Sequence, residues 1–216
     1  SIAANVITSS EPVGIGFLSM EMPEAAVSDR LIAMEARMSL HDVRRGYFKT
    51  SRWTDLTNAA ARIAAGPLFV DDSSYLSVLE VRRRLRTLAR RLSKTNTPLG
   101  LVIIDYIGIM RGSSTRVENR QLEVAEISRG LKALAKDLNI PVIALSQLSR
   151  RVEENTRTDG RPRLSDLRDS GALEQDADVV MLIYREAAAK PKDPSVDQGK
   201  AEIIIAKQRQ GSIGSV

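Results

Sequence analysis

Short, continuous apolar runs recur along the chain and constrain its fold more than any other feature of the sequence. The runs predicted to be strands are 13–19, 67–72, 101–105, 141–147, 178–184 and 201–208. Most show no alternation of apolar and polar residues, which is typical of strands buried on both faces of a parallel sheet. The run LVIID (101–105) is the clearest, and it raises the question why a buried strand should end on the carboxylate of Asp105.

Amphipathic segments separate these runs. The predicted helices are 23–38, 51–65, 77–92 and 119–139, whose apolar residues recur every three or four positions. SVLE (77–80) is a capping box that begins one of them. Strand–helix–strand units of this kind predict right-handed crossovers and an α/β domain with a doubly wound, mostly parallel sheet flanked by helices. The 216 residues suffice for one such core.

Composition excludes several classes of protein. The chain has no cysteine, so it can form neither a disulfide framework nor a thiolate metal site, and its single histidine, His41, excludes a histidine-rich zinc site. No apolar run approaches the length needed to span a bilayer. The net charge of +5 is compatible with a nucleic-acid partner but does not establish one.

Polar and charged residues follow the predicted strands. In an open parallel sheet, ligands bind beyond the carboxyl ends of the strands. The residues expected to converge there are Glu21, Asp105, Gln147, Arg185, Lys207 and Arg209.

This set suits a nucleotide hydrolase. Asp105 could hold Mg²⁺ together with waters and phosphates. Glu21 could orient an attacking water, and Gln147 could hydrogen-bond a γ-phosphate. Lys207 and Arg209 could stabilise phosphoryl charge, in cis or from a neighbouring subunit. Each residue taken alone also has a structural interpretation, as a strand end, a helix-terminal acid or a solvated cation; only their common edge favours catalysis.

The phosphate-binding motif G-x-x-x-x-G-K-[ST] is not in the chain. The Gly199–Lys200 pair precedes a predicted strand instead of a helix, so it is no P-loop. Residues 1–7 look like the later turns of the helix that follows one. We therefore expect the P-loop upstream of Ser1, a chain truncated at both ends, and no activity from these residues alone.

Several segments resemble the C-terminal, RecA-like ATPase domain (a P-loop NTPase core) of DnaB-type replicative helicases, and the resemblance covers essentially all of residues 1–216. They are FLSMEM (17–22), PLFVDDSS (67–74), VIIDYIGIM (102–110), and the long, highly specific stretches 126–150, 164–185 and 203–214.

The resemblance implies a role for each candidate. Glu21 matches the acid that activates the hydrolytic water, Asp105 the Walker B aspartate, and Gln147 the γ-phosphate sensor. Lys207 and Arg209 match the pair that reaches into the neighbouring subunit's nucleotide.

It also implies a DNA-binding loop, in which Arg168, Asp169 and Gly171 grip the single-strand backbone. Asp169 stands where a glutamate is usual. The polar loop 150–163, with Arg150, is expected to contact the backbone without sequence preference, because it lacks aromatic residues for base stacking.

The implied function is an ATP- and Mg²⁺-dependent helicase motor that forms a homohexameric ring, moves 5′ to 3′ on single-stranded DNA, and works with a primase and a helicase loader. The implied location is the cytoplasm, at the nucleoid and away from membranes. Two alternatives stay open: a non-catalytic DNA-binding or ring-building module, and a recombinase that forms filaments.

Arginines crowd the predicted helix 77–92. They are Arg82, Arg83, Arg84, Arg86, Arg90 and Arg91. A solvated outer helix face is favoured over a nucleic-acid patch.

Overall fold

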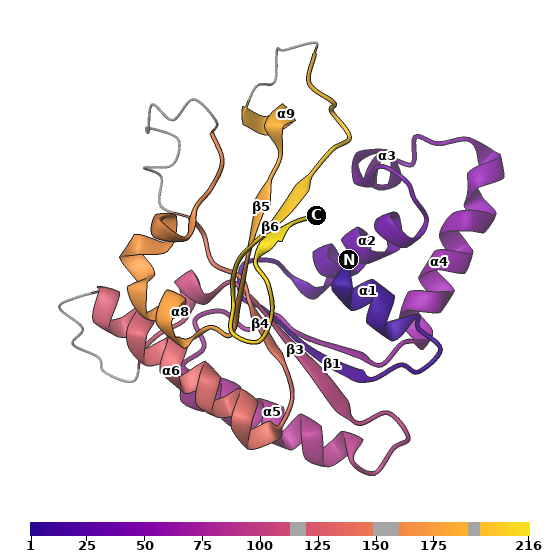
Figure 1. Cartoon of the computed structure of the whole chain (residues 1–216). Coiled ribbons are helices and arrows are strands. Elements are labelled where there is room, and N and C mark those ends of the chain that lie inside the picture. Colours follow the sequence, from indigo (N-terminus) through magenta and orange to yellow (C-terminus); the bar gives the residue numbers. More distant parts are fainter. Residues whose placement is uncertain (113–119, 149–159, 190–194) are drawn as a thin grey trace. The chain divides into compact units, whose positions relative to one another are not determined.

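A computed structural model describes residues 1–112, 120–148, 160–189 and 195–216 (Figure 1). The chain divides into two compact units. The first comprises Ser1–Thr115 and Ala133–Ser146, and the second comprises Arg116–Lys132 and Gln147–Val216. Each unit has its own sheet, and the two are described separately.

The first unit contains a parallel sheet with strand order β2-β1-β3-β4. Its strands are β1 (Gly14–Ser19), β2 (Leu68–Asp71), β3 (Leu99–Asp105) and β4 (Val142–Ala144). In the register, Ile15 of β1 lies beside Leu68 on one side and Leu101 on the other. The parallel, helix-flanked α/β architecture predicted from the apolar runs is confirmed for this unit.

One face of this sheet packs against helices that come early in the chain. These are α1 (Ile2–Ile7), α2 (Glu24–Glu35) and α4 (Trp53–Ala65). Buried residues of β1 and β3, such as Ile15 and Ile103, form one core cluster with them. Between α2 and α4 lie α3 (Leu40–Arg45) and the 3-10 turn η1 (Thr50–Arg52). A further 3-10 turn, η2 (Ile107–Ile109), follows β3.

The opposite face of β1 packs against α5 (Val78–Leu92). The two meet closely because β1 presents glycine there: a Cβ built on Gly16 would lie 2.8 Å from Cδ2 of Leu85. Helix α5 begins with the predicted capping box, in which Ser77 and Glu80 each bind the other's backbone N–H. Helix α6 (Arg120–Leu138) begins in the second unit, and its last turns belong to the first.

The second unit contains an antiparallel sheet with strand order β5-β6-β7. Its elements after α6 are η3 (Leu164–Ser170), α8 (Gly171–Asp176), β5 (Val179–Tyr184), α9 (Glu186–Ala189), β6 (Glu202–Gln208) and β7 (Gly214–Ser215). Leu167, Val180 and Leu182 form its core.

The runs 178–184 and 201–208 are strands, as predicted, but their expected parallel direction is wrong. Burial alternates along β5, where Val180 and Leu182 are buried while Met181 and Ile183 are exposed. A parallel return generally requires a crossover helix of some length. Among the described residues between β5 and β6, the one helix is the four-residue α9. None of the described helices is long and apolar enough to cross a membrane.

Candidate functional site

Strand β3 ends on Asp105 at the carboxyl edge of the parallel sheet. The strand interior is fully buried at Val102 and Ile104, whereas Asp105 is half-buried. Ser19 of β1 lies directly beside Asp105, and the Met20 backbone N–H donates to the Asp105 carbonyl oxygen (2.8 Å). The carboxylate therefore stands at the rim of the core, where a ligand beyond the strand ends could reach it.

Glu21 lies in the bend that follows β1. The turn is closed by the Ser19 hydroxyl, which donates to the Met22 carbonyl oxygen (2.7 Å). Glu21 is exposed and precedes α2, which begins at Glu24. The interpretation of Glu21 as an acid in the first helical turn is therefore wrong, because Glu24 occupies that place. The parallel pairing of β1 with β3 brings the segments that carry Glu21 and Asp105 to the same edge.

Two further carboxylates end the neighbouring strand β2, and the sequence analysis assigned them no role. Asp72 accepts a hydrogen bond from the Glu24 backbone N–H (3.0 Å) and so caps α2. Asp71 accepts hydrogen bonds from Arg84 and Ser73. Burial raises the pKa of the Asp71 carboxyl, but the hydrogen bonds outweigh it, and the pKa lies below its usual value. Both side chains already have intramolecular partners.

The donor set at this edge fits Mg²⁺ better than a metal held by protein alone. No group of three or more His, Cys, Asp or Glu residues among the described part of the chain could enclose a metal ion. Magnesium commonly takes one or two carboxylates and completes its shell with waters and substrate phosphates. Asp105 could supply such a carboxylate.

The chain beyond β4 continues along β3. The Leu145 backbone N–H donates to the Ile104 carbonyl oxygen (2.9 Å), and the Leu145 carbonyl oxygen accepts from the Ile107 N–H (3.0 Å). Ser146 is the last residue of the first unit. Gln147, the predicted phosphate sensor, is exposed and is the first residue of the next segment, which belongs to the second unit.

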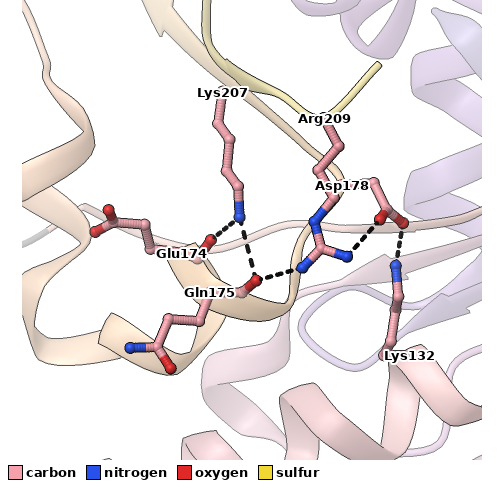
Figure 2. A network of polar contacts seen from close by, with 6 residues as sticks. All are labelled: Lys132, Glu174, Gln175, Asp178, Lys207 and Arg209. Carbon is pink, nitrogen blue, oxygen red and sulfur yellow. Dashed lines mark hydrogen bonds and ion pairs between the residues drawn. The ribbon is translucent and has the colours of Figure 1, made fainter.

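Lys207 and Arg209 lie at the end of β6 and contact the last turn of α8 (Figure 2). Lys207 Nζ donates to the carbonyl oxygens of Glu174 and Gln175. Arg209 Nη2 donates to the Gln175 carbonyl oxygen (2.8 Å), and Nη1 donates to Asp178 Oδ1 (3.2 Å). Within this chain, both predicted phosphate-binding cations therefore have intramolecular partners.

Asp178 is the centre of this network, and the sequence analysis missed it. Its carboxylate also accepts a hydrogen bond from Lys132 of α6. This hydrogen bond and the nearby positive charges outweigh desolvation and hold the pKa of Asp178 below its usual value. The only sequence signal was an acid placed immediately before a strand, in the stretch DAD (176–178).

Arg185 lies at the other end of the antiparallel pair. Tyr184 pairs with Glu202, the first residue of β6, whereas Val180 pairs with Lys207. At about 3.4 Å per residue, the two ends are roughly 14 Å apart along the strand. The expectation that Arg185 would share one edge with Lys207 and Arg209 is therefore wrong, since it assumed parallel strands. Arg185 donates instead to the Gln198 carbonyl oxygen (3.2 Å).

The predicted DNA-binding residues fall at the start of α8. Arg168 and Asp169 belong to η3, and Gly171 is the first residue of α8. The Arg163 backbone N–H donates to Asp166 Oδ2 (2.7 Å) at the start of η3. Arg150 and most of the polar loop predicted over 150–163 lie outside the described residues.

Most arginines of α5 have intramolecular partners. Arg82 and Arg86 both pair with Asp137 in the last turn of α6, and Arg84 pairs with Asp71. Arg91 stacks over the Phe69 ring, with its guanidinium carbon 5.8 Å from the ring centroid. These contacts support the structural interpretation of the basic helix over a nucleic-acid patch.

Known proteins resemble the chain over nearly its whole length. The sequence matches the DnaB-like helicase C terminal domain family over residues 1–216. It is 44% identical over 200 residues to the replicative DNA helicase DnaB of Leifsonia xyli, covering 93% of this chain and 42% of that protein. It is 41% identical to the DnaB of Geobacillus stearothermophilus, covering 100% of this chain and 45% of that protein.

Solved structures are similar as well. One of them, the structure of an ATPase domain, matches with a TM-score of 0.88 and 33% identity, over 99% of this chain and 72% of that one. A DnaB-like replicative helicase studied for its interactions with primase matches with a TM-score of 0.85 and 33% identity, over 94% of this chain and 47% of that one. The chain spans less than half the length of the curated relatives it matches.

Proposed function

Because the chain belongs to the family of DnaB-like helicase C-terminal domains, we propose that it is the ATP-driven motor of a replicative DNA helicase. In this proposal, residues 1–216 are one RecA-like ATPase domain that uses ATP and Mg²⁺. The domain acts in a homohexameric ring that moves 5′ to 3′ on single-stranded DNA. It works in the cytoplasm, at the nucleoid, and cooperates with a primase and a helicase loader.

The observation that carries the proposal is the pairing of β1 with β3. It brings two acids of different character to one edge of a parallel sheet: Asp105 at the rim of the core and Glu21 in an exposed bend. In the proposed reaction, Asp105 helps hold the magnesium ion, which neutralises phosphate charge. Glu21 accepts a hydrogen bond from the attacking water and orients it toward the γ-phosphate.

The remaining roles follow from the same proposal. Gln147 contacts the γ-phosphate and reports its presence. Lys207 and Arg209 stabilise charge on the nucleotide of a neighbouring subunit. Arg185 also contacts the nucleotide, while Arg150, Arg168, Asp169 and Gly171 bind the DNA backbone.

The test is Glu21→Gln in the natural protein, with Glu24→Gln as the matched control. Glu24 is an acid three residues away, in the first turn of α2. We expect Glu21→Gln to lower the kcat of DNA-stimulated ATP hydrolysis by about 10²- to 10⁴-fold, the usual contribution of a general base, and to leave ATP binding unchanged. Glu24→Gln should keep normal turnover. Full activity in Glu21→Gln would contradict the role of Glu21.

Action between subunits is tested by mixing variants. Arg209→Ala should abolish hydrolysis in rings, because each site would lack the arginine that its neighbour supplies. Mixed with Glu21→Gln, it should recover part of the activity, since some interfaces then combine an intact Glu21 with an intact Arg209. No recovery in rings whose mixed composition is established by native mass spectrometry would count against action in trans.

A further inference from the structure

The contacts of Lys207 and Arg209 with α8 suggest how these cations are positioned. The acceptors are the carbonyl oxygens of Glu174 and Gln175 in the last turn of that helix. Carbonyl groups in a last helical turn lack partners within the helix and carry the negative end of its dipole, so they attract cations. These hydrogen bonds, together called the tie, join the end of β6 to α8 (Figure 2).

Asp178 fixes Arg209 twice. Its carbonyl oxygen accepts from the Arg209 backbone N–H (2.9 Å), and its carboxylate accepts from the Arg209 guanidinium (3.2 Å). The backbone bond sets where the chain leaves β6, and the side-chain bond sets the direction of the guanidinium. Arg209 has more N–H donors than these contacts use, so a held guanidinium can still bind phosphate.

The network carries an excess of positive charge. Lys132, Lys207 and Arg209 surround the carboxylate of Asp178; with the carboxylate of Glu174, whose carbonyl oxygen also belongs to the network, the sum is +3 − 2 = +1. The cluster therefore keeps a net positive charge, and the Asp178 carboxylate orients the cations without cancelling it. The carbonyls that hold Lys207 and Arg209 belong to Glu174 and Gln175, three and four residues after Gly171, the first residue of α8. Because α8 is only six residues long, we expect a displacement at Gly171 to move those carbonyls with it.

We propose that Asp178 is a positioning residue. Together with the carbonyls of Glu174 and Gln175, it holds Lys207 and Arg209 against α8. DNA binding at the start of α8 is thereby transmitted to these two cations. The proposal rests on the proposed function, in which the start of α8 binds DNA and the cations contact a nucleotide. Asp178 itself touches neither.

The test compares Asp178→Ala with wild type in the natural protein, measuring kcat and KM for ATP with and without single-stranded DNA. We expect an about threefold fall in the stimulation of kcat by DNA, the size expected for one exposed ion pair, with KM unchanged. Asp178→Glu, which keeps the carboxylate, should restore part of the stimulation.

Glu202→Gln is the matched control, because it breaks the ion pair with Arg161 at the opposite end of β6. It should leave DNA stimulation intact. Unchanged stimulation in Asp178→Ala, or an equal loss of stimulation in Glu202→Gln, would overturn the proposal. Asp178→Asn replaces Asp178→Ala if thermal unfolding shows that the alanine variant does not fold.

Hydrogen exchange separates this proposal from the proposed function. Loosening the tie should speed amide exchange in peptides covering 171–178 and 206–210, whether or not ATP is hydrolysed. Unchanged exchange in Asp178→Ala would refute the tie. If Asp178→Ala speeds exchange but the wild-type protein shows no DNA-stimulated ATPase, the contacts of Asp178 stand. The proposed function is then refuted, and with it the transmission of DNA binding.

Discussion

Gly16 of β1 lies against Leu85 of α5, and we expect the cost of an alanine at position 16 to depend on that leucine. A Cβ at position 16 would lie 2.8 Å from Leu85 Cδ2, whereas ordinary contacts begin at 3.4 Å, so something must shift by about 0.6 Å (3.4 − 2.8). Leu85 is 1% exposed and has little room to move. Overpacking of this kind typically costs about 1–3 kcal/mol.

The same alanine should behave differently once Leu85 is truncated. Leu85→Ala alone should cost about 2–5 kcal/mol, because it leaves a cavity in the core. In that background the clash is gone, and the new methyl group fills part of the cavity for about 0.8 kcal/mol. A further 0.4–1 kcal/mol, roughly, comes from restricting the unfolded chain. Gly16→Ala should thus destabilise the natural sequence and stabilise Leu85→Ala. The restriction of the unfolded chain is the same in both backgrounds, so the coupling is about 2–4 kcal/mol.

Urea unfolding measures this coupling. Trp53 is the only tryptophan of the chain and lies in the same unit as Gly16, so its fluorescence reports on the unit that is perturbed. Leu31→Ala is the matched control, because it removes the same atoms from a buried leucine of the cluster on the other face of the sheet. Additive effects of Gly16→Ala and Leu85→Ala, or equal coupling to Leu31→Ala, would refute the proposed close approach.

Three further predictions concern stability. Ser77→Ala removes the capping box with Glu80 and should lower the unfolding free energy by about 0.5–2 kcal/mol, measured by thermal unfolding; no change would contradict the cap. Gly46→Ala should cost about 1–2 kcal/mol, because Gly46 ends α3 with a φ of +65°; an unchanged melting temperature would argue against this backbone conformation. The lowered pKa of Asp71 stabilises the fold above the usual aspartate pKa of about 3.9, and this contribution is lost as the pH falls through the lower folded value. Asp71→Asn should therefore flatten the acid side of a stability–pH curve, and an unaltered curve would contradict the ion pair with Arg84.

Local patterns predicted most of the elements in both units. The apolar runs, the three- and four-residue spacing of the helices and the capping box at 77–80 are each set by interactions a few residues apart. The position of Asp105 followed from the same reasoning, because the carboxyl ends of parallel strands meet at one edge.

Strand direction could not be obtained in this way. A continuous apolar run such as VVMLIY (179–184) is compatible with a parallel or an antiparallel neighbour, and the neighbour is chosen by the path of the chain between β5 and β6. That choice separates Arg185 from Lys207 and Arg209, which the sequence alone had grouped together.

The amino-acid sequence by itself determined where the strands and helices of this protein form, which acid follows β1 and which acid ends β3. The reason is that backbone hydrogen bonding and periodic burial act over short distances along the chain. The tertiary structure alone decided the partners of Lys207 and Arg209. Asp178 is separated by 31 residues from Arg209 and by 46 from Lys132, so nothing local marks it as their common partner. Contacts over such separations form only when the folded chain brings α6, α8 and the end of β6 together around that carboxylate.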